Sequence, residues 1–281
     1  MNLKRILCCV LLLLTLLTVG CENNTGDPSS AVLPAPTEMK LEILSTGDSD
    51  CILVSADGYT ILCDLADRDD YELIEAKLRE WDVKKIDCIY LTHYDKDHIG
   101  SVSAILRDFK VDEIVGPDYQ SKTSEYAELM TYIKSRKMEL RRLTASERRN
   151  FGALSVEVNV PSKQYYGDEN DYSLILSLHY GDTAFLLCGD AMKERLTEAL
   201  PAVGGHYDLV KLPHHGEYNK AVESLIKSAT PGYAVSCVAS KSEAEAKLVS
   251  LLSRYKVESF LTCEGGVTVV SDGKKLTVSA N

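Results

Sequence analysis

The sequence predicts an α/β sandwich, in which two β-sheets pack together and helices flank them. Two observations predict this class. Strand-like runs come first, and strands then alternate with helical periods through the rest of the chain. The alternation also divides into two halves, each with enough strands for a sheet of its own. Two layered sheets with outer helices suit this pattern better than one doubly wound sheet.

Each element follows from the period of its apolar residues, about two for a strand and about 3.6 for a helix. Asp57-Gly58, between the second and third strand-like runs, is a hairpin turn signal. Strands are expected at 41–44, 51–55, 60–63, 86–91, 113–115, 154–160, 173–179, 184–188, 208–212, 232–238 and 258–262, with a last hairpin at 267–278. Helices are expected at 71–80, 99–106, 124–137, 191–199, 219–227 and 243–254.

Composition excludes several classes of protein. The 281 residues carry a net charge of −11, and 45% of them are hydrophobic. A chain of this length and apolar content can bury a substantial core, so it is not a disordered protein. Its acidic balance excludes binding of nucleic acid through overall positive charge. Only one apolar run approaches membrane length, which excludes a protein with several membrane spans.

The N-terminus has the pattern of a secretory signal. Lys4 and Arg5 precede an apolar run over 6–19, which is shorter than the ~20 residues that a spanning helix needs. The run ends at Gly20-Cys21 and resembles the bacterial lipoprotein signal, in which the cysteine is lipidated and becomes the new N-terminus. An ordinary signal peptide or a short anchor is the alternative. Either way, the folded part is exported across the cytoplasmic membrane.

Three segments follow from this interpretation. Residues 1–21 are the lipoprotein signal, and residues 22–38 are polar, rich in Pro and Ser, and typical of a flexible tether. Residues 39–281 are expected to form the folded domain. A lipid on Cys21 would anchor that domain to the membrane, at the cell surface or on the periplasmic side.

The strongest chemical signal lies just after the apolar strand at 86–91. His93, Asp95, Asp97 and His98 stand within six residues, on a loop between that strand and a helix. Alternate side chains of an extended segment point the same way, so His93 and Asp95 can face one point and the other two a neighbouring point. A charged surface loop with a helix-capping aspartate is the alternative, but it does not explain converging carboxylates and imidazoles.

This stretch resembles the His-x-His-x-Asp-His signature of the metallo-β-lactamase superfamily, in a variant with Asp95 at the second position. Other blocks extend the resemblance over nearly the whole mature chain. Asp64 resembles the aspartate that braces the metal loop, Asp190 the one that bridges both metals, and Asn170-x-x-Ser173 also matches. Residues 211–216, Lys-Leu-Pro-His-His-Gly, resemble the block whose histidine completes the second metal site. Together the blocks are most similar to ComEC-type hydrolase domains of DNA-uptake proteins and to surface phosphorylcholine esterases.

The resemblance implies a four-layer αββα sandwich of two mixed sheets and a site for two divalent ions, zinc or manganese. The implied ligands are His93, Asp95, Asp97, His98, Asp190 and one of His214 and His215; the other histidine would line the cleft as an acid or an orienting group. Asp64, Asn170 and Ser173 would support the site. Lys211 is either an edge lysine that reaches water or a catalytic cation that faces an anionic substrate.

Two departures from the family pattern limit what the resemblance implies. Asp95 replaces the imidazole of β-lactam hydrolases, which makes a β-lactam the least favoured substrate. Residues 235–240 lead straight into a helix, where ComEC-type domains have a loop with His and Pro. This second departure does not affect the expected metal ligands. It means that the way in which ComEC-type domains position their substrate cannot be carried over to this chain.

The expected activity is hydrolysis of a phosphodiester, small or nucleic acid, by a hydroxide that two metal ions generate from water at neutral pH; Asp97 and the histidine pair would take part. Residues 134–149 carry seven basic and two acidic residues, and they are either a solvated helix face and turn or a ridge that contacts phosphates. Other metallo-hydrolase substrates (a phosphorylcholine ester, a lactone, a thioester) and a non-catalytic surface-binding lipoprotein are the alternatives. No protein partner can be inferred.

Overall fold

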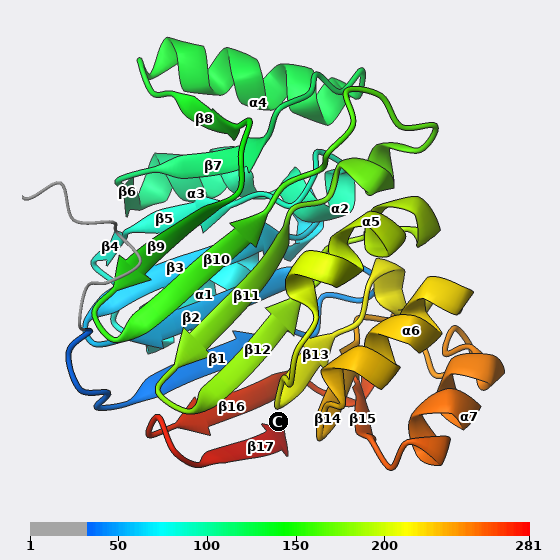
Figure 1. Ribbon diagram of the computed structural model, residues 1–281. Helices are drawn as coiled ribbons and strands as arrows, with labels where there is room; N and C mark the ends of the chain where they lie inside the picture. The colour runs from blue at the N-terminus through cyan, green and yellow to red at the C-terminus, as the bar shows by residue number, and fades with distance from the viewer. Residues whose placement is uncertain (1–32) are drawn as a thin grey trace, which may run out of the picture. The chain divides into compact units, whose positions relative to one another are not determined.

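Two β-sheets pack face to face at the centre of the molecule, as the computed structural model in Figure 1 shows. The structure describes residues 33–281. The signal expected at 1–21, with Cys21, and most of the tether lie outside the described residues. Among residues 33–281, no helix combines the length and the apolar character that crossing a bilayer requires.

The first sheet has eight strands in the order β17-β16-β1-β2-β3-β5-β7-β8. Its strands are β1 (Met39–Ile43), β2 (Cys51–Ala56), β3 (Tyr59–Leu65), β5 (Cys88–Tyr90), β7 (Ile114–Pro117), β8 (Leu140–Leu143), β16 (Val267–Ser271) and β17 (Leu276–Ala280). The neighbours from β3 to β8 are parallel, and the other pairs are antiparallel. A separate parallel pair joins β4 (Lys85–Ile86) to β6 (Lys110–Val111).

The second sheet has seven strands in the order β15-β14-β13-β12-β11-β10-β9. Its strands are β9 (Glu147–Phe151), β10 (Leu154–Asn159), β11 (Ile175–Tyr180), β12 (Thr183–Leu187), β13 (Leu209–Lys211), β14 (Tyr233–Ser236) and β15 (Glu258–Leu261). The run from β12 to β15 is parallel. Both sheets are therefore mixed, as expected.

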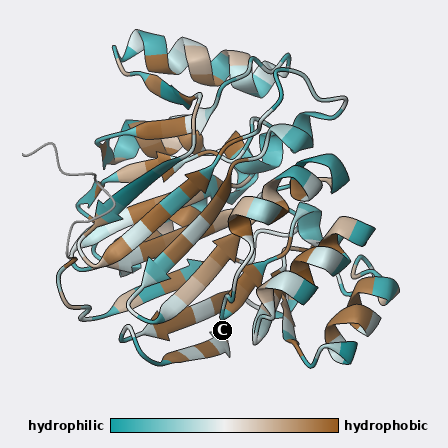
Figure 2. Cartoon of the chain, in the orientation of Figure 1, coloured by the Kyte–Doolittle hydropathy of each residue, from teal (hydrophilic) through white to brown (hydrophobic). Residues whose placement is uncertain are grey.

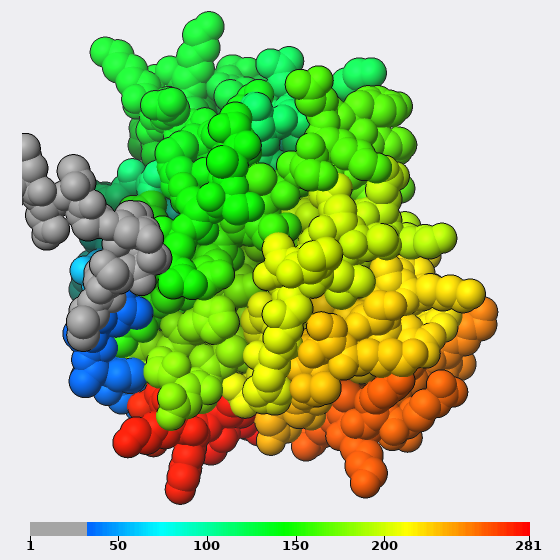
Figure 3. Space-filling view, in the orientation of Figure 1, coloured from blue at the N-terminus to red at the C-terminus, as the bar shows by residue number. Residues whose placement is uncertain are grey.

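Within residues 33–281, seven α-helices flank the sheets. They are α1 (Tyr71–Glu80), α2 (Lys96–Ile99), α3 (Val102–Asp108), α4 (Ser124–Ser135), α5 (Lys193–Val203), α6 (Lys220–Ala229) and α7 (Ala246–Arg254). In Figure 1, α5, α6 and α7 gather on the right of the second sheet, and Figure 3 shows their side chains as one continuous surface with its strands. The αββα sandwich predicted from the sequence is confirmed.

Three apolar cores correspond to the interfaces between these layers. One core joins side chains of both sheets, such as Leu41 and Val156. A second joins the first sheet to α1, α3 and α4, and a third joins the second sheet to α5, α6 and α7. In Figure 2 the strands are mostly hydrophobic, whereas the helices carry many hydrophilic residues. Burial of these faces stabilises the layers by roughly 25 cal/mol per Å² of apolar surface.

The parallel strands bring several loops to one end of the sandwich. The chain leaves β5 towards His93, leaves β12 towards Asp190, and leaves β13 towards His215. Ligands of open α/β sheets bind outside the carboxyl ends of parallel strands. The opposite end receives the N-terminal segment, where the Thr37 hydroxyl donates a hydrogen bond to Asp57 in the β2–β3 turn.

Residues 134–149 differ from the expected helix face and turn. Residues 134–135 end α4, and seven of the sixteen residues lie in β8 and β9, one at the edge of each sheet. Arg141 and Arg149 both pair with Glu113, and Arg148 pairs with Glu157. These ion pairs engage three of the seven basic residues of the segment, so those three arginines are not free to bind phosphates. The charged residues of this segment obscured the apolar pattern that predicts a strand, because edge strands expose one face to water.

Candidate metal centre

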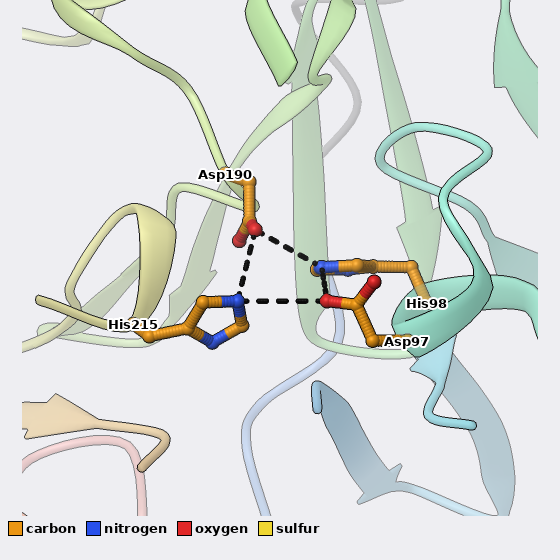
Figure 4. Close-up of side chains that lie close together, drawn as sticks. All are labelled: Asp97, His98, Asp190 and His215. Atoms are coloured by element: carbon orange, nitrogen blue, oxygen red, sulfur yellow. Dashed lines mark ion pairs between the residues drawn. The ribbon is translucent and has the colours of Figure 1, made fainter. Parts of the chain in front are cut away.

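Four side chains that could hold a metal ion meet at the carboxyl ends of the parallel strands, from three separate segments of the chain. Asp97 and His98 lie in α2, directly after the β5 loop. Asp190 follows β12, and His215 lies in the 3₁₀ turn η4 (His214–Gly216) after β13. Figure 4 shows the four side chains pointing toward a common centre. One ligand atom of each lies within 4.8 Å of all the others.

The distances within this group, which we call the four-ligand cluster, suit a shared cation. Nε2 of His98 lies 3.3 Å from Oδ2 of Asp97 and 3.3 Å from Oδ2 of Asp190. Nε2 of His215 lies 3.1 Å from the same oxygen of Asp190 and 3.5 Å from Oδ2 of Asp97. Two imidazole nitrogens and two carboxylate oxygens thus surround one point, a donor set that zinc and manganese both accept.

The conformation of η4 selects His215 rather than His214 for the cluster. Both histidines have positive φ values, 45° and 54°, which turn the chain sharply after Pro213. Gly216 follows with φ 94°, and a Cβ there would lie 2.4 Å from the Ser236 hydroxyl. The turn directs His214 to Glu217, whose carboxylate lies 2.6 Å from Nδ1. The sequence left open which of the two histidines is the ligand, and the turn assigns that position to His215.

Asp64 is hydrogen-bonded to the segment that carries the candidate ligands. It is fully buried and accepts hydrogen bonds from the backbone N–H and the hydroxyl of Thr92, both at 2.7 Å. Its Oδ2 also lies 2.8 Å from Nδ1 of His98. A carboxylate that accepts the Nδ1 proton leaves Nε2 as the lone-pair donor and fixes the orientation of the ring.

The loop around Asp190 is fixed by residues from the neighbouring segment. Ser173 is buried, and its hydroxyl accepts a hydrogen bond from the Asp190 backbone N–H at 3.1 Å. Gly189 has φ 51°, and a Cβ there would lie 2.7 Å from Cβ of Thr92. Asn170, the other predicted supporting residue, acts through its backbone, since its carbonyl accepts a hydrogen bond from the Ser173 N–H.

A buried arginine connects this loop to the body of the protein. Arg195 in α5 donates hydrogen bonds to the carbonyls of Ser173 and Asn159, at 2.8 and 2.7 Å, and pairs with Glu198 at 3.1 Å. We expect Arg195→Met to lower the free energy of unfolding by about 3–5 kcal/mol, because buried acceptors lose their charged donor. Urea denaturation measures the loss.

The matched control for Arg195 is Arg107→Met. Arg107 is exposed and pairs with its neighbour Asp108. Exposed ion pairs contribute about 0–1 kcal/mol, so this variant should unfold close to the wild type. Equal losses in the two variants would show that Arg195 does not connect the loop to the body of the protein.

His93 and Asp95 lie beside the four-ligand cluster and not within it. Their Nε2 and Oδ2 atoms are 3.7 Å apart, and the rings of His93 and His98 are 4.1 Å apart between centroids. Nδ1 of His93 lies 3.1 Å from the Thr92 hydroxyl, which leaves Nε2 facing Asp95. The pair has the position expected for the ligands of a second ion, next to the first.

The electrostatics of the site favour a bound cation. Five carboxylates and one ammonium lie in and directly around the cluster, a net charge of −4 with neutral imidazoles: Asp50, Asp64, Asp95, Asp97, Asp190 and Lys211. Burial disfavours the charged imidazole, but hydrogen bonds to Asp190 and Asp97 raise the pKa of His215 to about 9. The carboxylates that hold this proton are equally placed to hold a metal ion.

Unpartnered buried atoms give a second test of the fit. Among residues 33–281, Nε2 of His93, Nε2 of His98 and Oδ1 of Asp190 are buried without a hydrogen-bond partner. Buried polar atoms are nearly always paired, and each unpaired one costs about 1–3 kcal/mol. All three belong to the predicted ligands. The residues present therefore fit a divalent metal ion.

Lys211 has a different environment from the one expected for a cation that faces an anionic substrate. Its side chain is fully buried. Nζ contacts Oδ2 of Asp50 and lies 3.2 Å from the Gly189 carbonyl oxygen. Asp50 is the participant that sequence reasoning missed as a site residue. The sequence feature that could have indicated Asp50 is its position directly before the apolar strand β2, because a carboxylate buried there needs a charged or hydrogen-bonding partner.

The two adjacent histidines provide a matched pair of variants. We expect His215→Ala to weaken zinc binding by at least ~100-fold, because it removes one of four ligands. His214→Ala should bind zinc as the wild type does, since its ring contacts Glu217. Competition with a chromophoric chelator measures both. Equal loss in the two variants would overturn the assignment of His215 as the ligand.

Comparisons with known proteins agree with this geometry. Residues 44–240 match the model of the metallo-beta-lactamase superfamily, and this range contains every proposed metal ligand. The chain belongs to the metallo-β-lactamase superfamily. The resemblance of the sequence motifs is thereby confirmed at the level of the family. Membership implies a hydrolase and divalent metal binding, although the superfamily also has non-catalytic members.

Two curated relatives match part of the chain at low identity. ComE operon protein 3 of Bacillus subtilis is 23% identical over 188 residues, which are 66% of this chain and 24% of that protein. Recombination protein 2 of Haemophilus influenzae is 22% identical over 147 residues, 52% of this chain and 17% of that protein. The chain thus spans a quarter or less of each relative, and the first match supports the ComEC-type assignment.

Solved structures share the superfamily fold at low identity. The metallo-β-lactamase fold protein YhfI from Bacillus subtilis has a TM-score of 0.55 and 10% identity, and covers 86% of this chain and 100% of its own. CmlA from Streptomyces venezuelae, a diiron β-hydroxylase, has a TM-score of 0.51 and 13% identity, and covers 80% of this chain and 53% of its own. These similarities show the fold alone. The reaction has to be inferred from the residues of the candidate site.

Proposed function

We propose that this superfamily member is a metal-dependent phosphodiester hydrolase with a two-ion centre. The observation that carries the proposal is the convergence of Asp97, His98, Asp190 and His215 around one point, with His93 and Asp95 beside it. When bound, the ions would activate a water molecule near neutral pH and neutralise the phosphoryl oxygens. A carboxylate in place of the second histidine makes the site rich in oxygen and favours manganese more than an all-histidine site would.

The exposure of the four candidate ligands indicates from which side a substrate would approach them. His98 and Asp190 are buried, whereas Asp97 and His215 keep 24% and 21% of their side chains exposed. A substrate would therefore reach the cluster from the side of Asp97 and His215. His214 is 29% exposed, and its ring lies 5.6 Å from that of His215. With Nδ1 held by Glu217, its Nε2 could exchange a proton with the leaving oxygen.

Two observations bear on which kind of phosphodiester is the substrate. One curated relative is named for recombination, which favours a nucleic-acid phosphodiester. Three of the four arginines of β8 and β9 are paired with glutamates, which weakens one surface that could follow a nucleic-acid backbone. We therefore propose a short or small phosphodiester in preference to a long duplex, which would need many phosphate contacts.

A panel of substrates tests the proposal. The wild type and Asp97→Ala are assayed with Zn²⁺ or Mn²⁺ on bis(p-nitrophenyl) phosphate, short single-stranded DNA, duplex DNA, p-nitrophenyl phosphorylcholine, a lactone, a thioester and a β-lactam. We expect turnover of the phosphodiesters that Asp97→Ala loses. Turnover of another class alone would assign a different hydrolase, and no turnover with metal bound would leave a surface-binding lipoprotein.

We further propose that the protein is anchored at the cell surface through a lipid on Cys21. The support is the signal-like sequence over 1–21 and the tether that follows it. Metabolic labelling with a fatty acid should mark the wild type and not Cys21→Ala, which should appear in the soluble fraction. Equal labelling of the two would exclude lipidation at this residue.

A further inference from the structure

A buried ion pair lies directly beneath the four-ligand cluster. Lys211, in the parallel strand β13, and Asp50, just before β2, have fully buried side chains that contact each other. Lys211 Nζ also lies 3.6 Å from Oδ1 of Asp190. The pair thus links β13 of the second sheet to the segment directly before β2 of the first sheet, at the metal end.

Stabilisation of the fold alone does not explain a buried ion pair of this kind. A lysine in a strand ordinarily extends its ammonium to water, and two apolar residues of similar volume are often at least as stable as a buried ion pair. Three carboxylates nevertheless lie close together here: Asp50, Asp64 and Asp190. The single ammonium is placed between Asp50 and Asp190, where it reduces their repulsion and restrains both.

Two unpartnered atoms show what Asp50 faces. Its Oδ1 and Nδ1 of His215 are both buried, have no hydrogen-bond partner among the described residues, and lie 3.9 Å apart. An imidazole that binds metal through Nε2 almost always donates its Nδ1 proton to a carboxylate, a carbonyl or water. His98 already has such a partner in Asp64. His215 has Asp50 at the corresponding place, about 1 Å too far for a hydrogen bond.

We propose that Asp50 and Lys211 are positioning residues for the metal centre: Asp50 accepts the Nδ1 proton of His215, and Lys211 fixes the carboxylates of Asp50 and Asp190. The inference rests on the proposed metal dependence. Asp50 then does for His215 what Asp64 does for His98, and each histidine of the cluster has a buried carboxylate behind it. Lys211 stays with its carboxylates and does not contact the substrate.

Two double variants separate positioning from mere stability. Lys211→Met/Asp50→Leu and Lys211→Met/Asp50→Asn both remove the ammonium together with the Asp50 carboxylate, so the net charge of the site is unchanged, and both should fold. Only the asparagine keeps an oxygen that can accept the Nδ1 proton. We expect the leucine double variant to bind Co²⁺ about 10–100-fold more weakly than the wild type, and the asparagine one to recover much of that loss.

The readouts are the Co²⁺ absorption spectrum, chelator competition and the unfolding temperature. The control is Lys77→Met/Glu42→Gln. It removes an ion pair between a partly exposed lysine and a buried glutamate, whose other ionic contacts are with Glu80 and Lys40 rather than with the site. Equal Co²⁺ affinity in the two Lys211→Met double variants, or wild-type affinity in the leucine one, would overturn the inference. A wild type that binds no metal would instead overturn the proposed function, so the two failures are distinguishable.

Discussion

Asp190→Ala is expected to abolish binding of the shared cation and to reduce hydrolysis by about 10³-fold or more. Asp190 Oδ2 lies within 3.3 Å of both imidazole nitrogens of the four-ligand cluster. Its Oδ1 is buried, has no hydrogen-bond partner among residues 33–281, and lies 3.6 Å from Nζ of Lys211. A metal ion contributes several kcal/mol of charge stabilisation in the transition state, and about 1.4 kcal/mol corresponds to a tenfold change in rate.

The measurement for Asp190 combines metal analysis with steady-state kinetics. Asp182→Ala is the matched control, because Asp182 is an exposed aspartate in the turn that precedes the same strand, at the end away from the cluster. The control should keep both metal and rate. An Asp190→Ala enzyme with full metal content and a rate within tenfold of the wild type would contradict the assignment of Asp190 as a ligand.

Metal addition is expected to raise the unfolding temperature of the wild type by about 5–10 °C. The apo site holds an excess of buried carboxylates, and a cation bound only to the folded state relieves their repulsion. Occupation at about 100 times the dissociation constant stabilises the fold by roughly 2.7 kcal/mol per site, and about 2–4 °C corresponds to each kcal/mol in a domain of this size.

Differential scanning fluorimetry with Zn²⁺ and Mn²⁺ measures this shift, and Asp97→Asn supplies the control. Asp97 is a partly exposed ligand in α2, so its amide should preserve the fold while weakening the cation site. The variant should show less than half of the wild-type shift. An equal shift in the variant, or none in the wild type, would mean that the cluster does not bind the ion.

The sequence predicts the layers of the fold well because their causes are local. The helix expected at 71–80 coincides with α1, and the strand at 86–91 marks the place of β5, although Asp87 interrupts it. Asp87 accepts a hydrogen bond from the Thr60 N–H at 2.9 Å. Such a tertiary contact has no periodic signal. The strands β8 and β9 escaped prediction because they lie at sheet edges and carry paired charges.

The cluster of candidate ligands at 93–98 could be predicted from its spacing in the sequence. The role of each site residue, and the choice between His214 and His215, could not. His93, Asp95, Asp97 and His98 are neighbours in sequence, so their convergence needs only one loop. The choice of His215 depends on the left-handed backbone of η4, and the roles of Asp50 and Lys211 depend on contact between strands of different sheets. These features arise only when the sandwich has formed.

A metal-loaded crystal structure with anomalous diffraction at the zinc or manganese edge tests the central claim most directly. We predict a peak between Oδ2 of Asp97, Nε2 of His98, Oδ2 of Asp190 and Nε2 of His215, about 2.0–2.2 Å from each. A second peak is expected beside His93 and Asp95. A loaded crystal with its anomalous peaks elsewhere, or with none at these four atoms, would contradict the assignment of this cluster as the metal centre.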